Sequence, residues 1–192
     1  MTRINWADGT WTHEPVAVKQ DGDALVVEAA EGSDAWRHTS YGFVHDSEHA
    51  LVVPFPQDHA MEVEIAVDFS EQFDQAGIFL RQDEEHWVKA GVEYADGLLQ
   101  AGAVVTWPRS DWSVAPVPDW NGRRVTIRAS RTGDAVTIRA RRDDESWQFL
   151  RVIPVPEAAE LNAGPLACAP TRAGLRVRFL DWRLTAADDS LH

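Results

Sequence analysis

The sequence predicts an all-β fold of the sandwich type, and three observations carry that prediction. Short runs rich in β-branched and aromatic residues recur at a spacing of roughly 8–12 residues, which is typical of β-sandwiches. Several runs alternate apolar and polar residues, and no run shows the helical period of roughly 3.6 residues. The 192 residues, 44% of them hydrophobic, suit a single domain over residues 1–192, with a core over about 5–185 and a polar C-terminal tail.

The first half of the chain opens with an aromatic-bearing arm and then contains a series of strand-like runs separated by turn-forming residues. The strands expected there cover residues 25–29, 34–43, 50–55, 61–69, 74–81 and 87–93. The run at 61–69 alternates most regularly. Its acidic residues Glu62 and Glu64 share one face, which we expect to be solvated.

The stretch from residue 74 to residue 113 has two very different faces when it is read with a period of two. One face of its first two strands is entirely apolar, and we expect it in the core. The other face carries Gln75, Gly77, Phe79, Arg81, Trp87, Lys89, Gly91 and Glu93. Charged groups in the middle of a strand indicate either a ligand site or a structural ion network, and the sequence leaves both interpretations open.

The second half of the chain begins at a hairpin turn that the pair Asp96-Gly97 predicts. After a short strand at 104–106, Pro108 starts a loop that presents Asp111 and Trp112. Further strands are expected at 124–129, 135–140, 147–152, 166–170 and 175–184. We expect the polar tail from Thr185 onward to be frayed.

Two of these strands, at 124–129 and 135–140, form a predicted hairpin across a turn that contains Gly133. Its outward residues include the arginines Arg124, Arg128, Arg139 and Arg141. Such a ribbon suits an acidic partner or another copy of the chain. A solvated sheet face is the more common explanation for this pattern.

The totals of the sequence exclude several classes of partner. A net charge of −13 repels phosphate backbones, so we expect no nucleic-acid partner. The chain has no apolar run of 18 residues, so we expect no membrane partner, and its first residues lack a signal-peptide pattern, so we expect a cytoplasmic protein. Pairing of edge strands leaves a homodimer open.

Metal and thiol chemistry receive little support from the sequence. Cys168 is the single cysteine, so neither an intrachain disulfide nor a cysteine-based zinc cluster is expected. His45, Asp46 and His49 lie on one polar turn, but their spacing places no third strong ligand. We therefore expect no metal site and no cofactor.

Four sequence words resemble a known family. They lie at residues 34–43, 74–81, 87–93 and 110–113, and the resemblance continues through the last strand. The chain is similar to the uncharacterised concanavalin A-like family labelled as similar to a regulator of enolase. This resemblance implies a jelly roll of two curved antiparallel sheets, and it implies no settled activity. Ser40 and the segment 107–109 depart from the family pattern, and we expect those departures to alter the ligand rather than the fold.

The resemblance also suggests where a site lies, because the curved inner sheet of such sandwiches forms a groove that binds sugars in many relatives. Nine tryptophans are many for a chain of this size, and a flat indole ring stacks well on a sugar. Most tryptophans in proteins pack in the core, so a high tryptophan content by itself is not specific for sugar binding. The expected ligand-binding residues are Trp36, Thr39, Tyr41, Gln75, Arg81, Trp87, Lys89, Glu93, Thr106, Asp111 and Trp112.

Three functions remain open from the sequence. The first is a module that binds a carbohydrate or a sugar-derived small molecule in this groove. The second is a hydrolase or lyase with Glu93 and Asp111 as acid and base and Lys89 or Arg81 as an electrostatic stabiliser. The Glu-x-Asp-x-x-Glu pattern of laminarinase-type relatives is absent, however, and the balance is against an enzyme. The third is a regulatory domain that binds another protein, as the family label implies.

Overall fold

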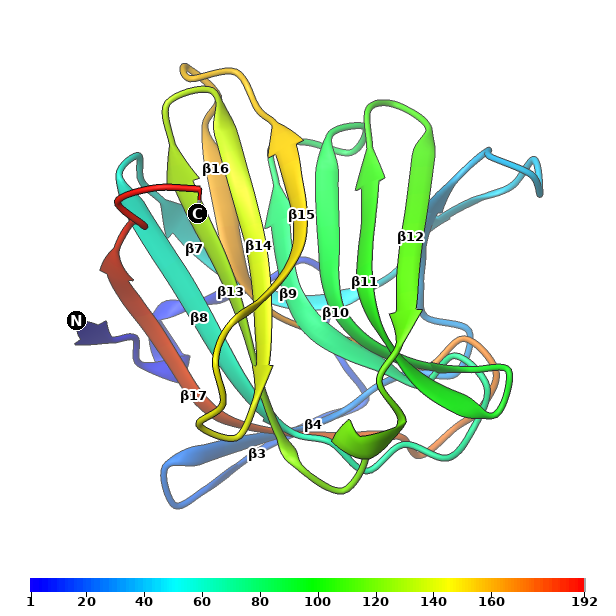
Figure 1. The fold of residues 1–192 in the computed structure, drawn as a ribbon. Helices are drawn as coiled ribbons and strands as arrows, with labels where there is room; N and C mark the ends of the chain where they lie inside the picture. Colours follow the sequence, from blue (N-terminus) through cyan, green and yellow to red (C-terminus); the bar gives the residue numbers. More distant parts are fainter. Residues whose placement is uncertain (192) are drawn as a thin grey trace.

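Two antiparallel β-sheets lie face to face in the computed structural model, which describes residues 1–191 (Figure 1). Within that range the helical segments are two short 3-10 turns, η1 (Trp6–Asp8) and η2 (Pro118–Trp120). None of the helical segments in the described part has the length and apolar character needed to cross a membrane. The predicted all-β sandwich of two curved antiparallel sheets is confirmed.

The strands divide into two large sheets and one small one. The eight-stranded sheet contains, in spatial order, β15 (Gln148–Pro154), β14 (Ala135–Arg142), β13 (Arg124–Thr132), β8 (His59–Ala66), β17 (Arg176–Ala186), β4 (Ala24–Glu28) and β3 (Ala17–Asp21), and β1 (Thr2–Arg3) pairs with β17. The seven-stranded sheet contains β12 (Ser110–Pro116), β11 (Leu98–Thr106), β10 (Trp87–Ala95), β9 (Gln75–Arg81), β16 (Leu161–Cys168), β7 (His49–Phe55) and β2 (Thr10–Trp11). The small sheet is a hairpin of β5 (Ala35–Arg37) and β6 (Val44–Asp46).

The core fills the space between the two large sheets. The predicted apolar face of β9 and β10 lies there, and its residues Ala76, Ile78, Leu80, Val88, Ala90 and Val92 are all buried. Trp182 of β17 is completely buried between the sheets and stacks on Trp6, with ring centroids 5.9 Å apart. Because one face of the seven-stranded sheet is sealed in this way, its opposite face remains for a site.

The hairpin of β10 and β11 turns at Asp96-Gly97, as the sequence predicts. Its two strands pair from Trp87 opposite Thr106 to Ala95 opposite Leu98. The intervening Asp96 and Gly97 have φ angles of 55° and 79°, which is the left-handed pair that a type I′ turn requires. This turn fixes which residues of β10 face the core.

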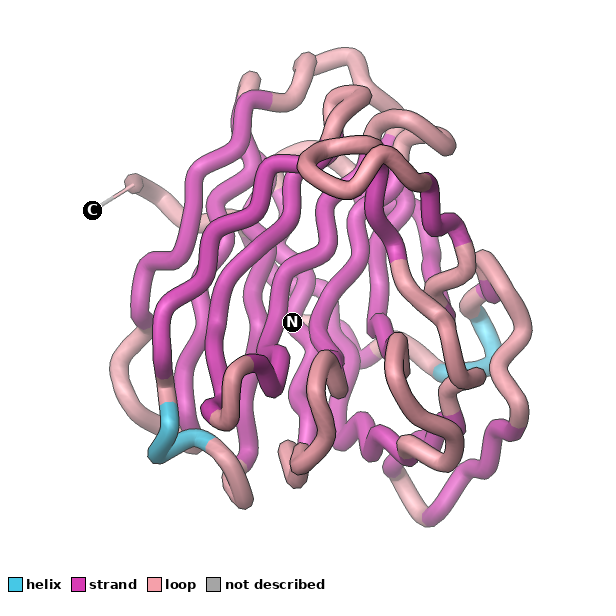
Figure 2. Tube along the Cα trace, turned by 90° about the vertical axis from the view of Figure 1, so that its right-hand side faces the viewer, coloured by secondary structure: helices cyan, strands magenta, loops and turns pink. Residues whose placement is uncertain are grey.

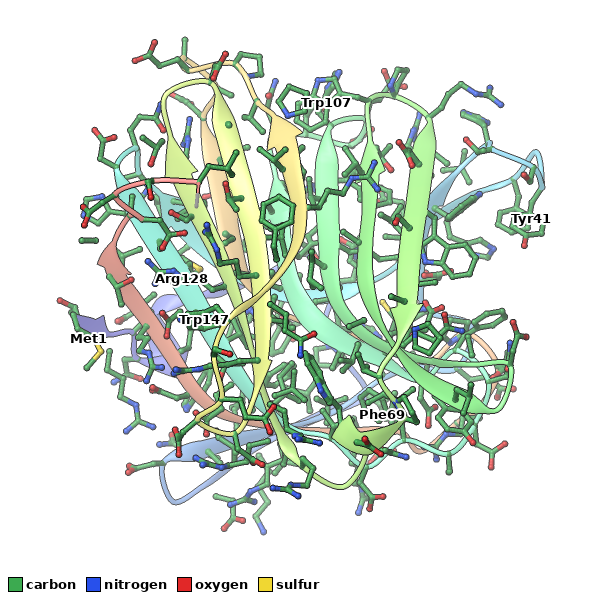
Figure 3. All side chains as sticks on the ribbon, viewed as in Figure 1. Met1, Tyr41, Phe69, Trp107, Arg128 and Trp147 are labelled. Carbon is green, nitrogen blue, oxygen red and sulfur yellow. The ribbon has the colours of Figure 1, made fainter. Side chains whose placement is uncertain are left out.

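The expectation of a solvated acidic face on β8 is wrong for Glu62. This carboxylate is buried, and it accepts hydrogen bonds from Arg128 Nη1 at 2.5 Å and from Arg183 Nε at 2.7 Å. Arg128 belongs to the arginine ribbon that we expected to be solvated, and it is buried as well (labelled in Figure 3). Strands β13 and β17 flank β8, so they bring the opposite charges together.

Several boundary predictions also differ from the structure. The sequence predicts a loop at Asp111 and Trp112, but both lie in strand β12. The strand expected over 34–43 ends at Arg37, because His38 and Ser40 have positive φ angles of 63° and 62° and turn the chain into a loop before β6. The fraying expected from Thr185 does not begin there. Strand β17 continues to Ala186, and the carboxylate of Asp188 accepts a hydrogen bond from Arg128 Nε at 2.9 Å.

Candidate functional site

A cavity of about 450 Å³ lies on the outer face of the seven-stranded sheet, between β9–β12 and the β5–β6 hairpin. Figure 2 views the molecule from this side of the sandwich. In Figure 3, Tyr41 marks the tip of the hairpin beyond β12, far from Arg128 on the eight-stranded sheet. Six of the predicted ligand-binding residues line this cavity: Trp36, Tyr41, Gln75, Lys89, Glu93 and Trp112.

The floor of the sheet beside the cavity is a row of three glycines, of which Gly91 and Gly102 line a smaller adjoining pocket. Gly77, Gly91 and Gly102 stand opposite one another on β9, β10 and β11. A Cβ atom on Gly91 would lie 2.2 Å from the carbonyl oxygen of Ala76, and one on Gly77 would lie 2.0 Å from that of Ala90. Side chains are therefore excluded from this row, and space remains open between Lys89 and Glu93 on either side of Gly91.

Lys89 is the centre of the polar cluster at one side of this row. Its side chain is buried, and its Nζ atom donates to Asp34 Oδ1 at 2.5 Å and to Gln75 Oε1 at 3.0 Å. Burial alone lowers the pKa of a lysine, but Asp34 and other nearby acidic groups outweigh it and raise the pKa of Lys89. The cluster is thus a charged, hydrogen-bonded donor group at the cavity wall.

Glu93 lies on the same face of β10 as Lys89, with Gly91 between them, and its carboxylate lacks a hydrogen bond. Its Oε1 atom is buried and has no hydrogen-bond partner in the described part of the chain. Burial raises the pKa of this carboxyl, Lys89 opposes that rise, and Asp34 and Asp96 add to it. An acceptor without a partner in a cavity wall is available to a ligand hydroxyl.

Aromatic rings form the opposite wall. Trp36 meets Tyr41 edge-on at 5.8 Å and Trp112 edge-on at 6.5 Å, measured between ring centroids. Tyr41 also stacks on Phe43 at 5.3 Å. Trp36 is buried, whereas Trp112 is 42% exposed and Tyr41 is 63% exposed, so these two rings present free surface to solvent.

Three predicted ligand-binding residues lie outside the cavity because the hairpin covers the end of the sheet that carries them. Trp87 is buried in a small second core, where its ring lies 5.6 Å from that of Phe79. Thr106 is also buried, and its hydroxyl pairs with that of Ser110 at 2.8 Å. Arg81 stands opposite Trp87 at that same end and lines no part of the cavity.

Thr39 and Asp111 are also misplaced by the sequence prediction. Thr39 supports the wall indirectly, because its carbonyl oxygen accepts the indole N–H of Trp36 at 3.0 Å. Asp111 lies on the opposite face of β12 from Trp112 and pairs with Arg151 at 2.7 Å. The structure therefore does not bring Glu93 and Asp111 together as the acid–base pair that the enzyme alternative needs.

The three polar residues of the turn around 45–49 separate in the structure. His45 lines the cavity and contacts the ring of Phe43 edge-on at 4.6 Å. His49 is buried, and its Nε2 accepts the backbone N–H of Ala30 at 3.0 Å. Asp46 is exposed at the end of β6 and is not part of the cavity lining.

Sequence reasoning missed Asp34, Phe43 and the glycine floor. Asp34 is the first residue of the recognised word at 34–43, and a lysine in the middle of a strand calls for a carboxylate partner. The signal for the floor is the spacing of Gly77, Gly91 and Gly102, which becomes visible once the strands are aligned.

The comparison with protein families decides the classification. A family model described as "Protein of unknown function (DUF1349)" matches residues 11–187. The chain belongs to this family. The Saccharomyces cerevisiae protein "Regulation of enolase protein 1" is 37% identical to this chain over 180 residues, which are 94% of this chain and 90% of the yeast protein. The resemblance read from the four sequence words is thereby confirmed.

Solved structures place the family among β-sandwiches. The crystal structure of a functionally unknown protein from Saccharomyces cerevisiae superposes with a TM-score of 0.89 at 36% identity, over 96% of this chain and 100% of that one. A xylan beta-1,4-xylosidase from Bacillus halodurans matches over 84% of this chain and 32% of its own, with a TM-score of 0.66 and 14% identity. An alginate lyase from Klebsiella pneumoniae matches over 90% and 85%, with a TM-score of 0.55 and 12% identity. At such low identities, the last two show the fold alone.

Proposed function

We propose that this protein binds a carbohydrate or a sugar-derived small molecule in the cavity on its seven-stranded sheet. The observation that carries the proposal is the combination, in one cavity, of exposed aromatic faces with an unsatisfied buried acceptor. The volume of about 450 Å³ lies within the range of about 300–1,000 Å³ that is typical of small-molecule sites.

The chemistry of a sugar ring matches both walls of this cavity. A pyranose has flat C–H faces, which pack on aromatic rings, and the free surfaces of Trp112 and Tyr41 offer such rings. Its hydroxyl groups both donate and accept. A hydroxyl that donates to Glu93 Oε1 gives that atom a hydrogen bond that it lacks, which favours binding because a buried unpaired acceptor is costly.

The charges of the cavity favour a neutral sugar over a phosphorylated one. The amine of Lys89 is already engaged by Asp34. Glu93 and Asp96 line the cavity as well, so an incoming phosphate meets unbalanced negative charge. Carbohydrate-active enzymes among the proteins that share this fold are compatible with the proposal.

A melting-temperature screen of the purified chain tests the proposal. The panel holds neutral mono- and disaccharides and the corresponding sugar phosphates. A ligand at about 100 times its Kd stabilises the native state by about 2.7 kcal/mol, which raises the Tm of a chain of this size by roughly 5–10 °C. We expect such a shift with at least one neutral sugar.

Two tryptophan variants locate the binding. Trp112→Ala should abolish the shift because it removes a free wall of the cavity. Trp147→Ala is the matched control, since that ring lies over Arg141 at 4.3 Å on the eight-stranded sheet and should leave the shift intact. No shift with any sugar in a cooperatively melting protein would contradict the proposal and direct attention to a protein partner.

A further inference from the structure

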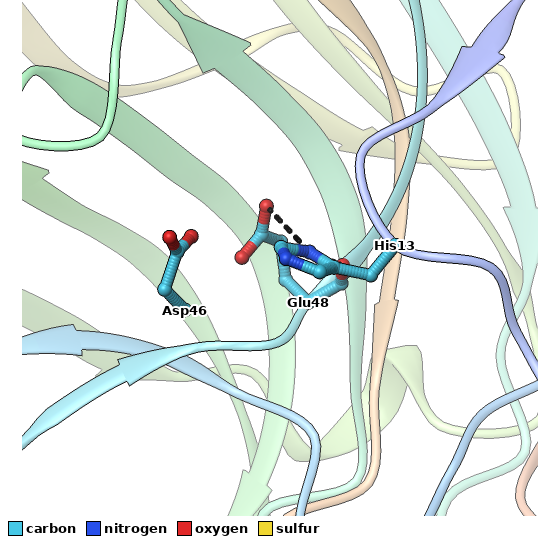
Figure 4. Close-up of side chains that lie close together, drawn as sticks. All are labelled: His13, Asp46 and Glu48. Carbon is cyan, nitrogen blue, oxygen red and sulfur yellow. Dashed lines mark hydrogen bonds and ion pairs between the residues drawn. The ribbon is translucent and has the colours of Figure 1, made fainter.

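A second polar cluster lies outside the cavity, where three segments of the chain meet. His13 follows β2, Asp46 ends β6, and Glu48 directly precedes β7. One potential ligand atom from each residue lies within 4.8 Å of those of the other two. Figure 4 shows the His13 ring and the two carboxylates directed toward a common space.

Glu48 is the observation that sets this cluster apart from an ordinary acidic surface group. Its side chain is 0% exposed, and neither carboxylate oxygen has a hydrogen-bond partner in the described part of the chain. The nearest cationic candidate is His13, whose Nδ1 lies 3.7 Å from Oε1. A buried carboxylate is costly unless it is paired, coordinates a metal or takes up a proton, and burial raises the pKa of Glu48. A bound cation would supply the counter-charge that hydrogen bonds do not.

The protonation of His13 leaves one ring nitrogen available to a cation. Nδ1 lies 3.0 Å from the backbone carbonyl oxygen of Glu48, which only accepts hydrogen bonds. Nδ1 therefore carries the proton in the neutral ring, and Nε2 keeps its lone pair. A hydrogen bond from one ring nitrogen to a carbonyl is the usual means by which proteins orient a metal-binding histidine.

We propose that His13, Asp46 and Glu48 bind a divalent transition-metal cation, for which Zn²⁺ is the best match. One imidazole and two carboxylates form a mixed nitrogen and oxygen set of the kind that Zn²⁺ accepts, with a remaining position for water. Ca²⁺ takes about 6–8 oxygen ligands and fits this set less well. Two negative charges beside a neutral imidazole also match a divalent cation in charge.

The position of the cluster gives the cation a structural role. Asp46 and His45 are neighbours on β6, and only His45 lines the cavity. A cation held by Asp46, Glu48 and His13 thus joins the base of the aromatic hairpin to the segments after β2 and before β7. The cation would hold in place the β5–β6 hairpin, which carries the aromatic wall with Trp36 and Tyr41. This inference does not depend on what the cavity binds.

Titration calorimetry on the EDTA-stripped full chain tests the site, with ZnCl₂ as the probe and MnCl₂ and CaCl₂ as comparisons. We expect one Zn²⁺ per chain, weaker Ca²⁺ binding and a rise in Tm on addition of Zn²⁺. Glu48→Gln removes a ligand while keeping the size of the side chain, and it should weaken Zn²⁺ binding by at least about tenfold. His13→Gln should do the same.

His86→Gln is the matched control, because His86 pairs with Asp83 at 2.7 Å on the surface and belongs to no three-residue cluster among the described residues. It should leave Zn²⁺ affinity unchanged. Circular dichroism of each variant separates loss of binding from loss of fold. The proposal is overturned if the folded chain takes up no Zn²⁺, if Glu48→Gln binds it as tightly as the parent, or if His86→Gln removes the binding. The first result would mean that a proton on Glu48 supplies the missing charge balance.

Discussion

At the scale of single residues, the cavity is organised by Lys89. A buried ammonium group is stable only with partners, and Asp34 and Gln75 provide them from separate segments of the chain. Because the Asp34 carboxylate already accepts a hydrogen bond from Lys89, Glu93 is the acceptor that remains free for a ligand. One lysine thereby determines which polar atoms a ligand meets.

Replacement of Lys89 by methionine should destabilise the protein. The change leaves the Asp34 carboxylate without its cation, and because that carboxylate is partly solvated we expect the free energy of unfolding to fall by about 2–3 kcal/mol. Urea unfolding measures the change. Lys19→Met is the control, since Lys19 is the other lysine and is exposed, and it should stay within about 0.5 kcal/mol of the parent.

Glu93 should make stability depend on pH. Its pKa in the folded protein is raised, so its contribution to stability is fully present below the unfolded-state pKa and is lost as the pH rises through the folded-state pKa. Glu93→Gln has no carboxyl to ionise. We therefore expect the variant to gain stability over the parent as the pH rises from 4 to 8, and the two to converge near pH 4. Urea midpoints at several pH values test this, and a difference that is constant with pH would contradict it.

At the scale of strands, the glycine row sets the shape of the site. Gly77, Gly91 and Gly102 lie side by side on neighbouring strands, and each lacks room for a Cβ atom next to a neighbouring backbone. Backbone atoms of a sheet can move aside for an added Cβ atom much less than the end of a flexible side chain can. The floor of the site is therefore fixed by the sheet itself.

Gly91→Ala should be strongly destabilising, because its Cβ would meet the backbone of β9 at 2.2 Å. We expect a loss above the range of about 1–3 kcal/mol that is typical of overpacking. Gly97→Ala is the control: its φ angle is 79°, but no atom lies within 4 Å of the added Cβ. That variant should lose only about 1–2 kcal/mol from backbone strain. Equal losses for the two variants would show that the row has no special role.

Sequence reasoning recovered local features of the strands and missed contacts between distant ones. The two faces of β9 and β10 and the turn at Asp96-Gly97 follow from alternation and turn chemistry, which depend only on neighbouring residues. The burial of Glu62 depends on which strands flank β8, and those strands come from residues 124–132 and 176–186. Period-two alternation predicts that the Glu62 side chain points away from the core. It does not predict which side chains of neighbouring strands cover that side chain.

The ion network around Glu62 offers a direct test of that burial. Glu62→Gln removes the charge shared by Arg128 and Arg183, and we expect a loss of about 2–3 kcal/mol in the free energy of unfolding. Glu64→Gln is the neighbouring control on the same strand face. Its pair with the half-exposed Arg124 spans 3.3 Å and should contribute less than about 1 kcal/mol.

At the scale of the whole molecule, the two sheets have different tasks. The eight-stranded sheet covers its outer face with ion pairs, and the C-terminal Asp188 joins them. The seven-stranded sheet instead leaves a cavity between its polar outer face and the β5–β6 hairpin, beside the glycine row. The site could be predicted in part, because Trp36, Tyr41, Gln75, Lys89, Glu93 and Trp112 follow from strand faces and sequence words. The hairpin that buries Trp87 and Thr106 could not, because its docking depends on the folded sheet.

The most direct measurement is an NMR titration of the ¹⁵N-labelled protein with neutral sugars, observed at the indole N–H signals. The nine tryptophans are spread over the molecule, so each sugar is tested against all surfaces at once. If the cavity binds sugar, the signals of Trp36 and Trp112 should move with increasing ligand, and those of the buried Trp120 and Trp182 should stay in place. Signals that remain unmoved with every sugar, or that move only at tryptophans outside the cavity such as Trp147, would contradict a carbohydrate site in this groove.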